Sequence, residues 1–122
     1  MGKVQIVLLA TVALLTTVLS GSASAGPRTN LTLTAGHTTV RLLCQPAGGS
    51  HPDAKSACRA IKTAHGDFDE LPDSPTFAAC TMEYRPVVAS ARGTWHGHHV
   101  RWKHKYANPC TLHTDTGVVF AF

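Results

Sequence analysis

The sequence has no run of five like charges, no internal repeat and no G-x-S-x-G elbow. Most nucleic-acid-binding domains show a stripe of Lys and Arg, whereas the basic residues here are scattered along the chain, so we expect no nucleic-acid partner. The missing elbow removes the local signature of an α/β-hydrolase. No linker divides the chain after its first residues, which predicts one domain with one modest core.

The long apolar run of the sequence lies at its start, in residues 4–19. It is short for a membrane span, which needs about 20 residues. Lys3 precedes the run, and the small residues Ala23-Ser24-Ala25 follow it as at a signal-peptidase site. We therefore expect residues 1–25 to be a signal peptide, with a membrane anchor as the alternative. Residues 26–122 are then a secreted, extracellular domain that has no membrane contact after cleavage.

The expected domain carries four cysteines, at Cys44, Cys58, Cys80 and Cys110. An even number of cysteines in a small secreted chain indicates two disulfides. Four cysteines allow three pairings, and their spacing does not choose among them. Without Lys3, ten basic residues face seven acidic ones, so the domain is mildly basic.

Alternating apolar and polar residues predict several β-strands. Residues 30–34 and 38–44 form one hairpin candidate, and residues 87–106 form a second with its turn at Arg92-Gly93. The ending GVVFAF predicts a last strand. The second strand of the second hairpin would have two different faces. A bulky face would hold His98, Val100, Trp102, His104 and Tyr106, and a basic face would hold His99, Arg101, Lys103 and Lys105.

Residues 51–66 predict a helix whose small apolar residues face the sheet. Pro52 suits the first helical position, Ser50 or His51 the cap, and Gly66 the exit.

Asp67, followed three residues later by Glu70, resembles a capping box and predicts a second, short helix that ends near Leu71. Together these elements predict an α+β fold in which a helix packs on an antiparallel sheet of about five strands.

Eight histidines raise the possibility of a metal site or of acid–base catalysis. They are densest at residues 96–99, but one strand cannot place three imidazoles around one ion, so we expect no metal and no cofactor. A ribonuclease-like site would draw on His98, His99, Lys103 and His104, which alternate between opposite faces of that strand. A small His-rich enzyme or a metal-binding module remains the alternative function.

Residues 72–86 form a proline-rich loop that is tied down at Cys80. A tethered loop loses little entropy when a partner grips it, which favours tight binding. Met82 lies two residues beyond the tether, between the polar residues Thr81 and Glu83, and would suit the primary pocket of a protease. The residues alone leave equally open a structural loop with an ordinary surface methionine.

The segment CQPAGGSHPDAKSAC, residues 44–58, resembles the signature of the subtilisin-inhibitor family typified by the Streptomyces inhibitor. The resemblance continues in order through most of residues 26–122. Its further matches are Gly66-Asp67 with Leu71, the Cys-x-Met-x-Tyr-x-Pro-Val run at 80–87, Gly93 with Trp95 and Gly97, Asn108-x-Cys110, and the ending VFAF.

This resemblance implies a five-stranded antiparallel sheet with two helices and a homodimer formed through the sheets. It implies the disulfides Cys44–Cys58 and Cys80–Cys110. It also implies that the chain is a serine-protease inhibitor and not an enzyme.

The reactive bond that the resemblance carries over is Met82–Glu83, with Met82 in the S1 pocket of the protease. The other implied protease-contact residues are Ala79, Cys80 and Thr81 before the bond and Tyr84 and Arg85 after it. Asn108 would support the loop. Because methionine is neutral, the expected partners are serine proteases of subtilisin or chymotrypsin-like specificity.

Overall fold

The structure is a computed structural model that describes residues 2, 13, 28–74 and 79–122. The expected signal peptide, residues 1–25, lies almost wholly outside the described residues and stays a prediction. Within the described residues, no helix is both long and apolar enough to cross a membrane. The elements are β1 (Thr29–Ala35), β2 (Thr38–Cys44), β3 (Gly48–Gly49), α1 (Ala54–Thr63), the 3-10 helix η1 (Phe68–Glu70), β4 (Val87–Trp95), β5 (His98–Tyr106), α2 (Pro109–Thr116) and the 3-10 helix η3 (Gly117–Phe120).

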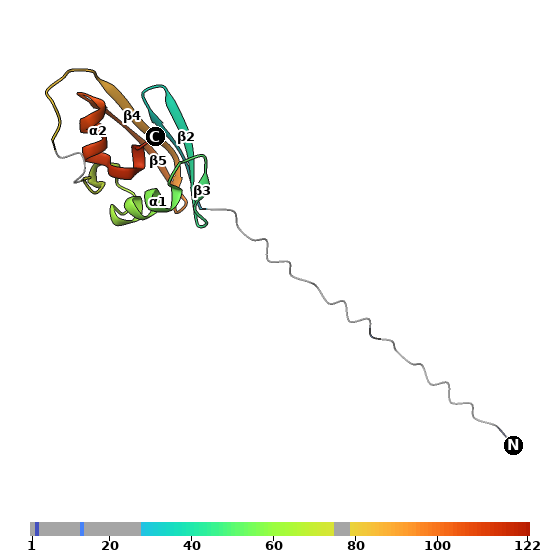
Figure 1. Ribbon diagram of the computed structural model, residues 1–122. Coiled ribbons are helices and arrows are strands. Elements are labelled where there is room, and N and C mark those ends of the chain that lie inside the picture. The colour runs from blue at the N-terminus through green and yellow to red at the C-terminus, as the bar shows by residue number, and fades with distance from the viewer. Residues whose placement is uncertain (1, 3–12, 14–27, 75–78) are drawn as a thin grey trace.

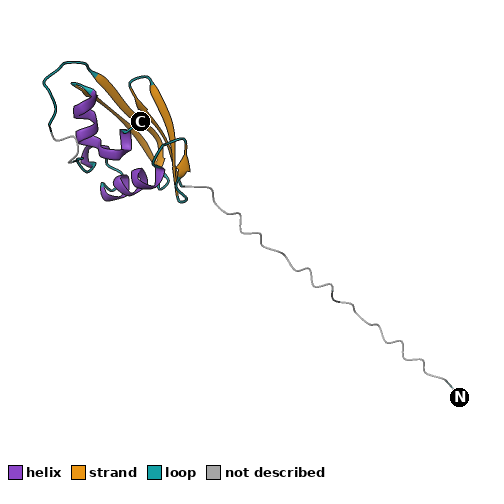
Figure 2. Ribbon diagram, viewed as in Figure 1, coloured by secondary structure: helices purple, strands orange, loops and turns teal. Residues whose placement is uncertain are grey.

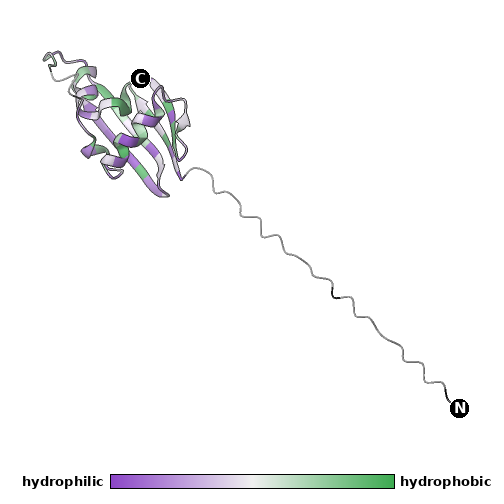
Figure 3. Cartoon of the chain, turned by 60° about the horizontal axis from the view of Figure 1, so that its bottom comes forward, coloured by the Kyte–Doolittle hydropathy of each residue, from purple (hydrophilic) through white to green (hydrophobic). Residues whose placement is uncertain are grey.

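The strands form one antiparallel sheet in the order β3-β2-β1-β4-β5. The helices cover one face of this sheet and leave the other face open (Figures 1 and 2). Polar and apolar residues alternate along the strands (Figure 3), and the apolar ones face the helices, where Leu31, Leu33 and Leu42 are fully buried. The predicted α+β fold with five antiparallel strands is therefore confirmed.

The first predicted hairpin is confirmed, but the turn of the second was misplaced. The chain reverses at His96-Gly97, where both residues have positive φ (47° and 80°), as a two-residue hairpin turn of type I′ requires. Gly93 lies inside β4 instead, opposite Leu31 and with φ of 132°. A Cβ at this position would collide with the carbonyl oxygen of Asn30. Close approach of two strands, and not a turn, accounts for this glycine.

The helix predicted within residues 51–66 is present as α1, but it begins at Ala54 with Asp53 as its cap, so Pro52 lies before the helix and not at its first position. The carboxylate of Asp53 accepts a hydrogen bond from the backbone N–H of Ser56 at 3.2 Å. Hydrogen bonds from Ser56 hold the pKa of Asp53 below its ordinary value. At the other end of α1, Gly66 takes the left-handed conformation (φ of 82°) expected of an exit residue.

His51, one of the two expected caps, is buried and joins the start of α1 to the end of the chain. Its Nδ1 accepts from the backbone N–H of Asp53 at 3.0 Å, and its Nε2 lies 3.0 Å from the carbonyl oxygen of Val119. A neutral imidazole with its proton on Nε2 makes both hydrogen bonds. Ser50, the other expected cap, accepts instead from the backbone N–H of Arg41.

The short helix expected after Asp67 is the 3-10 helix η1. The carboxylate of Asp67 accepts from the N–H of Asp69 at 2.9 Å, rather than forming the expected box with Glu70. Asp69 in turn accepts from the indole N–H of Trp102 at 2.9 Å. Within the bulky face of β5, η1 thus covers Trp102, whereas His98 and His104 are exposed.

The last strand expected at residues 117–122 is wrong. The chain forms α2 and then η3, in which Val119 and Phe120 are fully buried. Apolar residues occur consecutively in this segment rather than alternately, so both sides of the backbone need cover. Packing over the face of the sheet, between α1 and α2, provides that cover, whereas a position at the sheet edge would not.

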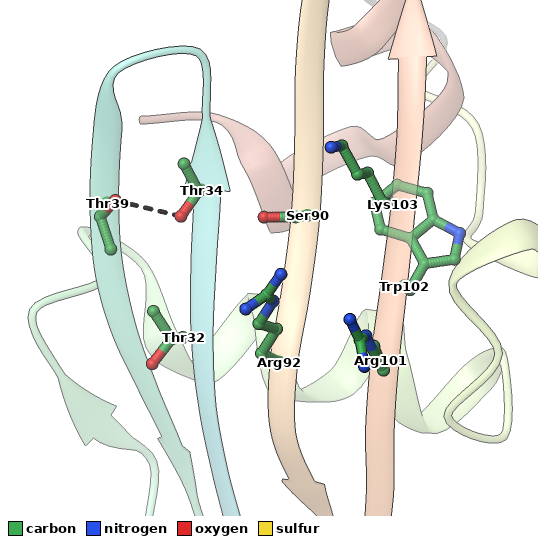
Figure 4. Close-up of a pocket in the computed structure, with 8 residues that line it drawn as sticks. All are labelled: Thr32, Thr34, Thr39, Ser90, Arg92, Arg101, Trp102 and Lys103. Atoms are coloured by element: carbon green, nitrogen blue, oxygen red, sulfur yellow. Dashed lines mark hydrogen bonds between the residues drawn. The ribbon is translucent and has the colours of Figure 1, made fainter.

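Five of the basic residues that are scattered in the sequence lie on the open face of the sheet, and Figure 4 draws three of them, Arg92, Arg101 and Lys103. All seven acidic residues lie outside the strands, on helices, caps and loops. The outward positions of β2, β4 and β5 carry five cations, which are Arg41, Arg92, Arg101, Lys103 and Lys105. Alternation along the strands therefore places these five cations on one side of the sheet, while Lys55, Arg59 and Lys62 lie on α1.

Burial of Tyr106 predicts a loss of stability at high pH. Tyr106 ends β5 with 8% of its surface exposed. Burial raises the pKa of Tyr106 to about 12, with smaller contributions from Asp115 and Asp69. An unfolded tyrosine ionises near its ordinary pKa of 10.0, so between these two values the unfolded chain holds fewer protons than the folded one, and stability falls as pH rises.

We expect urea unfolding of the wild type to show this fall between pH 10 and pH 12. Tyr106→Phe should flatten it, whereas Tyr84→Phe, on the exposed loop, should not. Equal slopes for the wild type and Tyr106→Phe would contradict the assignment.

Candidate functional site: a tethered exposed loop

Residues 79–86 form an irregular segment that arches away from the body of the domain before β4 (Figure 1). Two large hydrophobic side chains of the described residues are highly exposed, and both lie here: Met82 at 99% and Tyr84 at 70%. The exposed large apolar side chains of the described residues thus lie together at one projecting place. Apolar surface displayed in this way marks a site of interaction with another protein.

Covalent and hydrogen bonds hold the segment at both ends. The disulfide Cys80–Cys110 ties its beginning to the first turn of α2. Toward its end, the backbone N–H of Arg85 donates to the carbonyl oxygen of Ala107 at 2.9 Å. Ala107 lies just before α2 and Cys110 in its first turn, so one piece of scaffold holds the whole loop.

Asn108 lies in the same connection and fills the space beneath the loop. It is 5% exposed, and its side-chain Nδ2 donates to the carbonyl oxygens of Thr81 at 3.2 Å and Glu83 at 2.8 Å. These two residues flank Met82. The backbone on both sides of Met82 is therefore fixed by a single amide group, while the Met82 side chain remains in solvent.

The other half of the Asn108 amide caps α2. Its Oδ1 accepts from the N–H of Thr111 at 2.9 Å, and the Thr111 hydroxyl accepts from the N–H of Asn108 at 3.3 Å. Pro109, at the start of the helix, has the fixed φ that suits this position. Only an amide can both accept at the helix and donate to two carbonyls, so aspartate cannot replace asparagine here without loss.

The structure places the predicted contact residues together on one exposed segment, with Cys80 half-buried at its anchor. Glu83 and Arg85 form an ion pair at 3.5 Å. Both side chains are exposed, so this pair contributes little to loop rigidity. The exposed members of the set are Ala79, Thr81, Met82, Glu83, Tyr84 and Arg85.

Both disulfides that the family resemblance implied are present. Cys80–Cys110 anchors the loop, and Cys44–Cys58 joins the end of β2 to α1. In the chain-entropy model, loops of these lengths make the two bonds worth about 3 and 4 kcal/mol. A domain of this size has a total stability of roughly 5–15 kcal/mol, so the disulfides carry a large share of it.

Reasoning from the sequence missed α2 and the hydrogen bond from Arg85 to Ala107, whereas support of the loop by Asn108 was implied by the family resemblance. The sequence does contain a signal for this helix. Asn108 is a capping residue, Pro109 suits the first helical position, and Thr111 supplies a hydroxyl group two residues later. The bond from Arg85 to Ala107 had no local signal, because it joins residues from separate elements.

The eight histidines are spread over several elements of the fold. In the described part of the chain, no group of three or more His, Cys, Asp or Glu side chains could hold a metal ion. His98 and His104 share the helix-facing side of β5, and His104 lies against the ring of Tyr106. His99 and Lys103 lie on the opposite side, so the sheet separates the residues that a ribonuclease-like site would need.

A small disulfide-tied scaffold that presents one exposed loop, anchored on both sides, is an architecture of protein protease inhibitors. The family model described as subtilisin inhibitor-like matches residues 13–108. The chain belongs to this subtilisin inhibitor-like family, which consists of protease inhibitors and not of enzymes.

Individual relatives agree with this family. The chain is 46% identical over 84 residues to protease inhibitor SIL-V1/SIL-V4 of Streptomyces netropsis, covering 68% of this chain and 76% of the relative. It is 42% identical over 84 residues to a transglutaminase-activating metalloprotease inhibitor of Streptomyces mobaraensis, covering 68% of this chain and 57% of the relative.

Among solved structures, the fold is similar to Streptomyces caespitosus sermetstatin in complex with Bacillus licheniformis subtilisin. The TM-score is 0.62 and the sequence identity 28%, over 76% of this chain and 97% of that chain.

Proposed function

We propose that this chain inhibits subtilisin-type serine proteases by inserting residues 79–86 into the active site as a substrate would, with Met82–Glu83 as the reactive bond. The observation that carries the proposal is the grip of Asn108 on the carbonyl groups either side of Met82. A segment already held in one extended shape loses little conformational entropy on binding, so more of the contact energy appears as affinity.

The position of each loop residue follows from this bond. Met82 enters the S1 pocket, and Thr81, Cys80 and Ala79 extend through S2 to S4. Tyr84 and Arg85 lie on the primed side. Glu83 places a negative charge next to the reactive bond, so proteases with an acidic S1′ region should bind less well.

The mechanism rests on keeping the cut ends together. The protease serine attacks the carbonyl carbon of Met82, and cleavage leaves an acyl-enzyme and a free amino group on Glu83. The part before the cut stays held by the Cys80 disulfide and by Asn108. The part after it stays held by Asn108 and by the hydrogen bond of Arg85. The amino group thus remains next to the acyl carbon, and religation at high effective concentration competes with hydrolysis.

The neutral Met82 side chain determines which proteases bind. Large apolar S1 pockets, of subtilisin or chymotrypsin-like type, accept it. A trypsin-like pocket has a buried carboxylate that would be left without a cation, and an uncompensated buried charge is costly.

Titration of subtilisin with the oxidised protein tests the proposal. We expect loss of enzyme activity at one loop per active site, and recovery of that activity after reduction of the disulfides. Slowly clipped protein should show a new N-terminus at Glu83. A new terminus elsewhere would remove Met82–Glu83 as the reactive bond, and RNA cleavage or zinc-dependent folding would instead favour the His-rich enzyme or metal-binding alternative.

We propose further that residues 1–25 direct export and are removed, so that the extracellular protein begins at Gly26. The patterned start of the sequence supports this proposal. Mass spectrometry of protein recovered from culture medium should give the mass of residues 26–122.

A homodimer through the sheets, as the resemblance implied, would have to use the open face, because the helices cover the other. Two-fold packing of that face brings like charges together, since it carries five cations and no carboxylate. We propose that such a dimer forms only when salt screens this repulsion. Sedimentation should show a monomer at low ionic strength and association at high ionic strength. A dimer that is strongest at low salt would contradict this mode of assembly.

A further inference from the structure

Met82 carries the only thioether of residues 26–122, since the other methionine of the sequence is Met1. We propose, on the basis of the function proposed above, that Met82 is a site of oxidation by peroxides. Conversion of its sulfur to the sulfoxide would switch off the free inhibitor. The loop would then respond to the oxidants around the protein as well as to proteases.

The Met82 side chain is open to an oxidant. It is 99% exposed, and it lies on the segment that arches away from the body of the domain (Figure 1). An oxidant must reach a lone pair of the sulfur, so a methionine without cover reacts more readily than one packed in a core. In the free protein, no folded element has to open before Met82 can react.

The other sulfur atoms of the domain are already oxidised. Cys44–Cys58 and Cys80–Cys110 are disulfides, and the described residues include no free cysteine. A thiolate would be the first target of a peroxide, but these residues offer none. Among the oxidisable rings, Trp95 is buried and Trp102 is half-buried. A peroxide therefore meets the protein first at the residue that is expected to enter the protease.

The reaction transfers one oxygen atom. A lone pair of the Met82 sulfur attacks one oxygen of hydrogen peroxide, the O–O bond breaks, and an S–O bond forms. Sulfur loses two electrons, the peroxide gains two, and the second oxygen leaves as water. The product is a polar side chain at the position where an apolar S1 pocket binds. Burying a polar group without a hydrogen-bond partner is unfavourable, so the oxidised loop should bind such pockets less tightly.

The scaffold does not depend on the group that is oxidised. Asn108 holds the backbone carbonyl groups of Thr81 and Glu83, while the side chain of Met82 remains in solvent. Sulfoxide formation removes neither these hydrogen bonds nor the disulfide at Cys80. The effect of oxidation should therefore fall on recognition of the protease and not on folding.

Binding and oxidation should oppose each other. In the complex, the S1 pocket would enclose the sulfur and shield it from peroxide. By linkage, the factor by which oxidation weakens binding equals the factor by which binding disfavours the oxidised form. Peroxide would thus inactivate surplus free inhibitor and spare inhibitor that is already bound.

The test treats the free, disulfide-bonded protein with hydrogen peroxide and removes the peroxide with catalase before subtilisin is added. Mass spectrometry should locate one added oxygen, about 16 Da, at Met82. The inhibition constant for subtilisin should rise about 10-fold to 100-fold. The melting temperature should not change. In the preformed complex, oxidation of Met82 should be much slower than in the free protein.

Met82→Leu is the matched control, because leucine is apolar but has no sulfur. Its inhibition constant should be the same before and after peroxide treatment, whatever the untreated value is. Met82→Gln places an uncharged polar side chain at this position. Without any treatment, it should inhibit about as weakly as the oxidised wild type.

Three results would overturn the proposal. The first is a Met82 that stays unmodified at peroxide concentrations that oxidise a free methionine peptide. The second is complete sulfoxide formation with an unchanged inhibition constant. The third is an equal loss of inhibition in treated Met82→Leu, which would place the damage elsewhere. Failure of the proposed function would look different, because the untreated wild type would not inhibit, or Met82 would oxidise as fast in the complex as in the free protein.

Discussion

Met82→Lys is expected to transfer inhibition from subtilisin toward trypsin. The wild type leaves the buried carboxylate of a trypsin pocket unpaired, and a lysine would supply its missing cation. Breaking a buried ion pair costs about 3–5 kcal/mol, which corresponds to a change in the trypsin inhibition constant of about 100-fold to 1,000-fold or more. Because the Met82 side chain is 99% exposed and touches no scaffold, the substitution should leave the melting temperature unchanged.

The inhibition constants for both enzymes are the measurement, and Met82→Leu is the matched control. Leucine keeps an apolar side chain of similar volume and should retain subtilisin inhibition without gaining trypsin. An unaltered preference in Met82→Lys would show that another residue occupies the S1 pocket.

Asn108→Asp is expected to convert the inhibitor into a substrate that subtilisin cuts and releases. An aspartate oxygen can still accept from Thr111 and cap α2, but it cannot donate to the carbonyl groups of Thr81 and Glu83. Two hydrogen bonds of about 1 kcal/mol each disappear, and oxygen is placed against oxygen. We expect clipping at Met82–Glu83 to accelerate about 30-fold or more.

The rate of clipping, followed by mass spectrometry under excess subtilisin, is the measurement. Thr111→Val is the control, because it removes the hydroxyl half of the capping box and leaves the grip on the loop intact. It should lower stability slightly without changing the clipping rate. If Asn108→Asp resists clipping as the wild type does, the amide does not hold the cut ends together.

The part of the fold governed by local periodicity could be predicted from the sequence. Alternating apolar and polar residues predicted β1 and β2, and small apolar residues at helical spacing predicted α1. The turn at His96-Gly97 was missed because Gly93 offered a more familiar turn signal, and only the pairing with β1 reveals why a glycine stands there. The ending failed for a related reason, since burial on both sides of η3 depends on α1 and α2 lying above the sheet.

The candidate site was predictable in its residues but not in its bonds. Cys80 and Met82 stood out in the sequence by their spacing and by their polar neighbours. The family resemblance then identified Met82–Glu83 as the reactive bond and Asn108 as its support. Asn108 both caps α2 and binds the loop because the end of β5 places it beneath the loop. No local sequence pattern predicts this position. The five cations on the open face likewise follow from strand register, because Arg41 and Arg101 come into one row only through the pairing of β1 and β4 between them.

Asn108 touches the loop only through backbone carbonyl oxygens, and this separates what the inhibitor recognises from how it is built. Main-chain groups are the same whatever side chains the loop carries. The side chains of residues 81 to 83 can therefore be exchanged without disturbing their support, so new target preferences can arise by single substitutions in a chain that folds as before. The scaffold thus holds loops of different sequence in the same way. Substitutions that change which proteases are inhibited need not lower the stability of the fold.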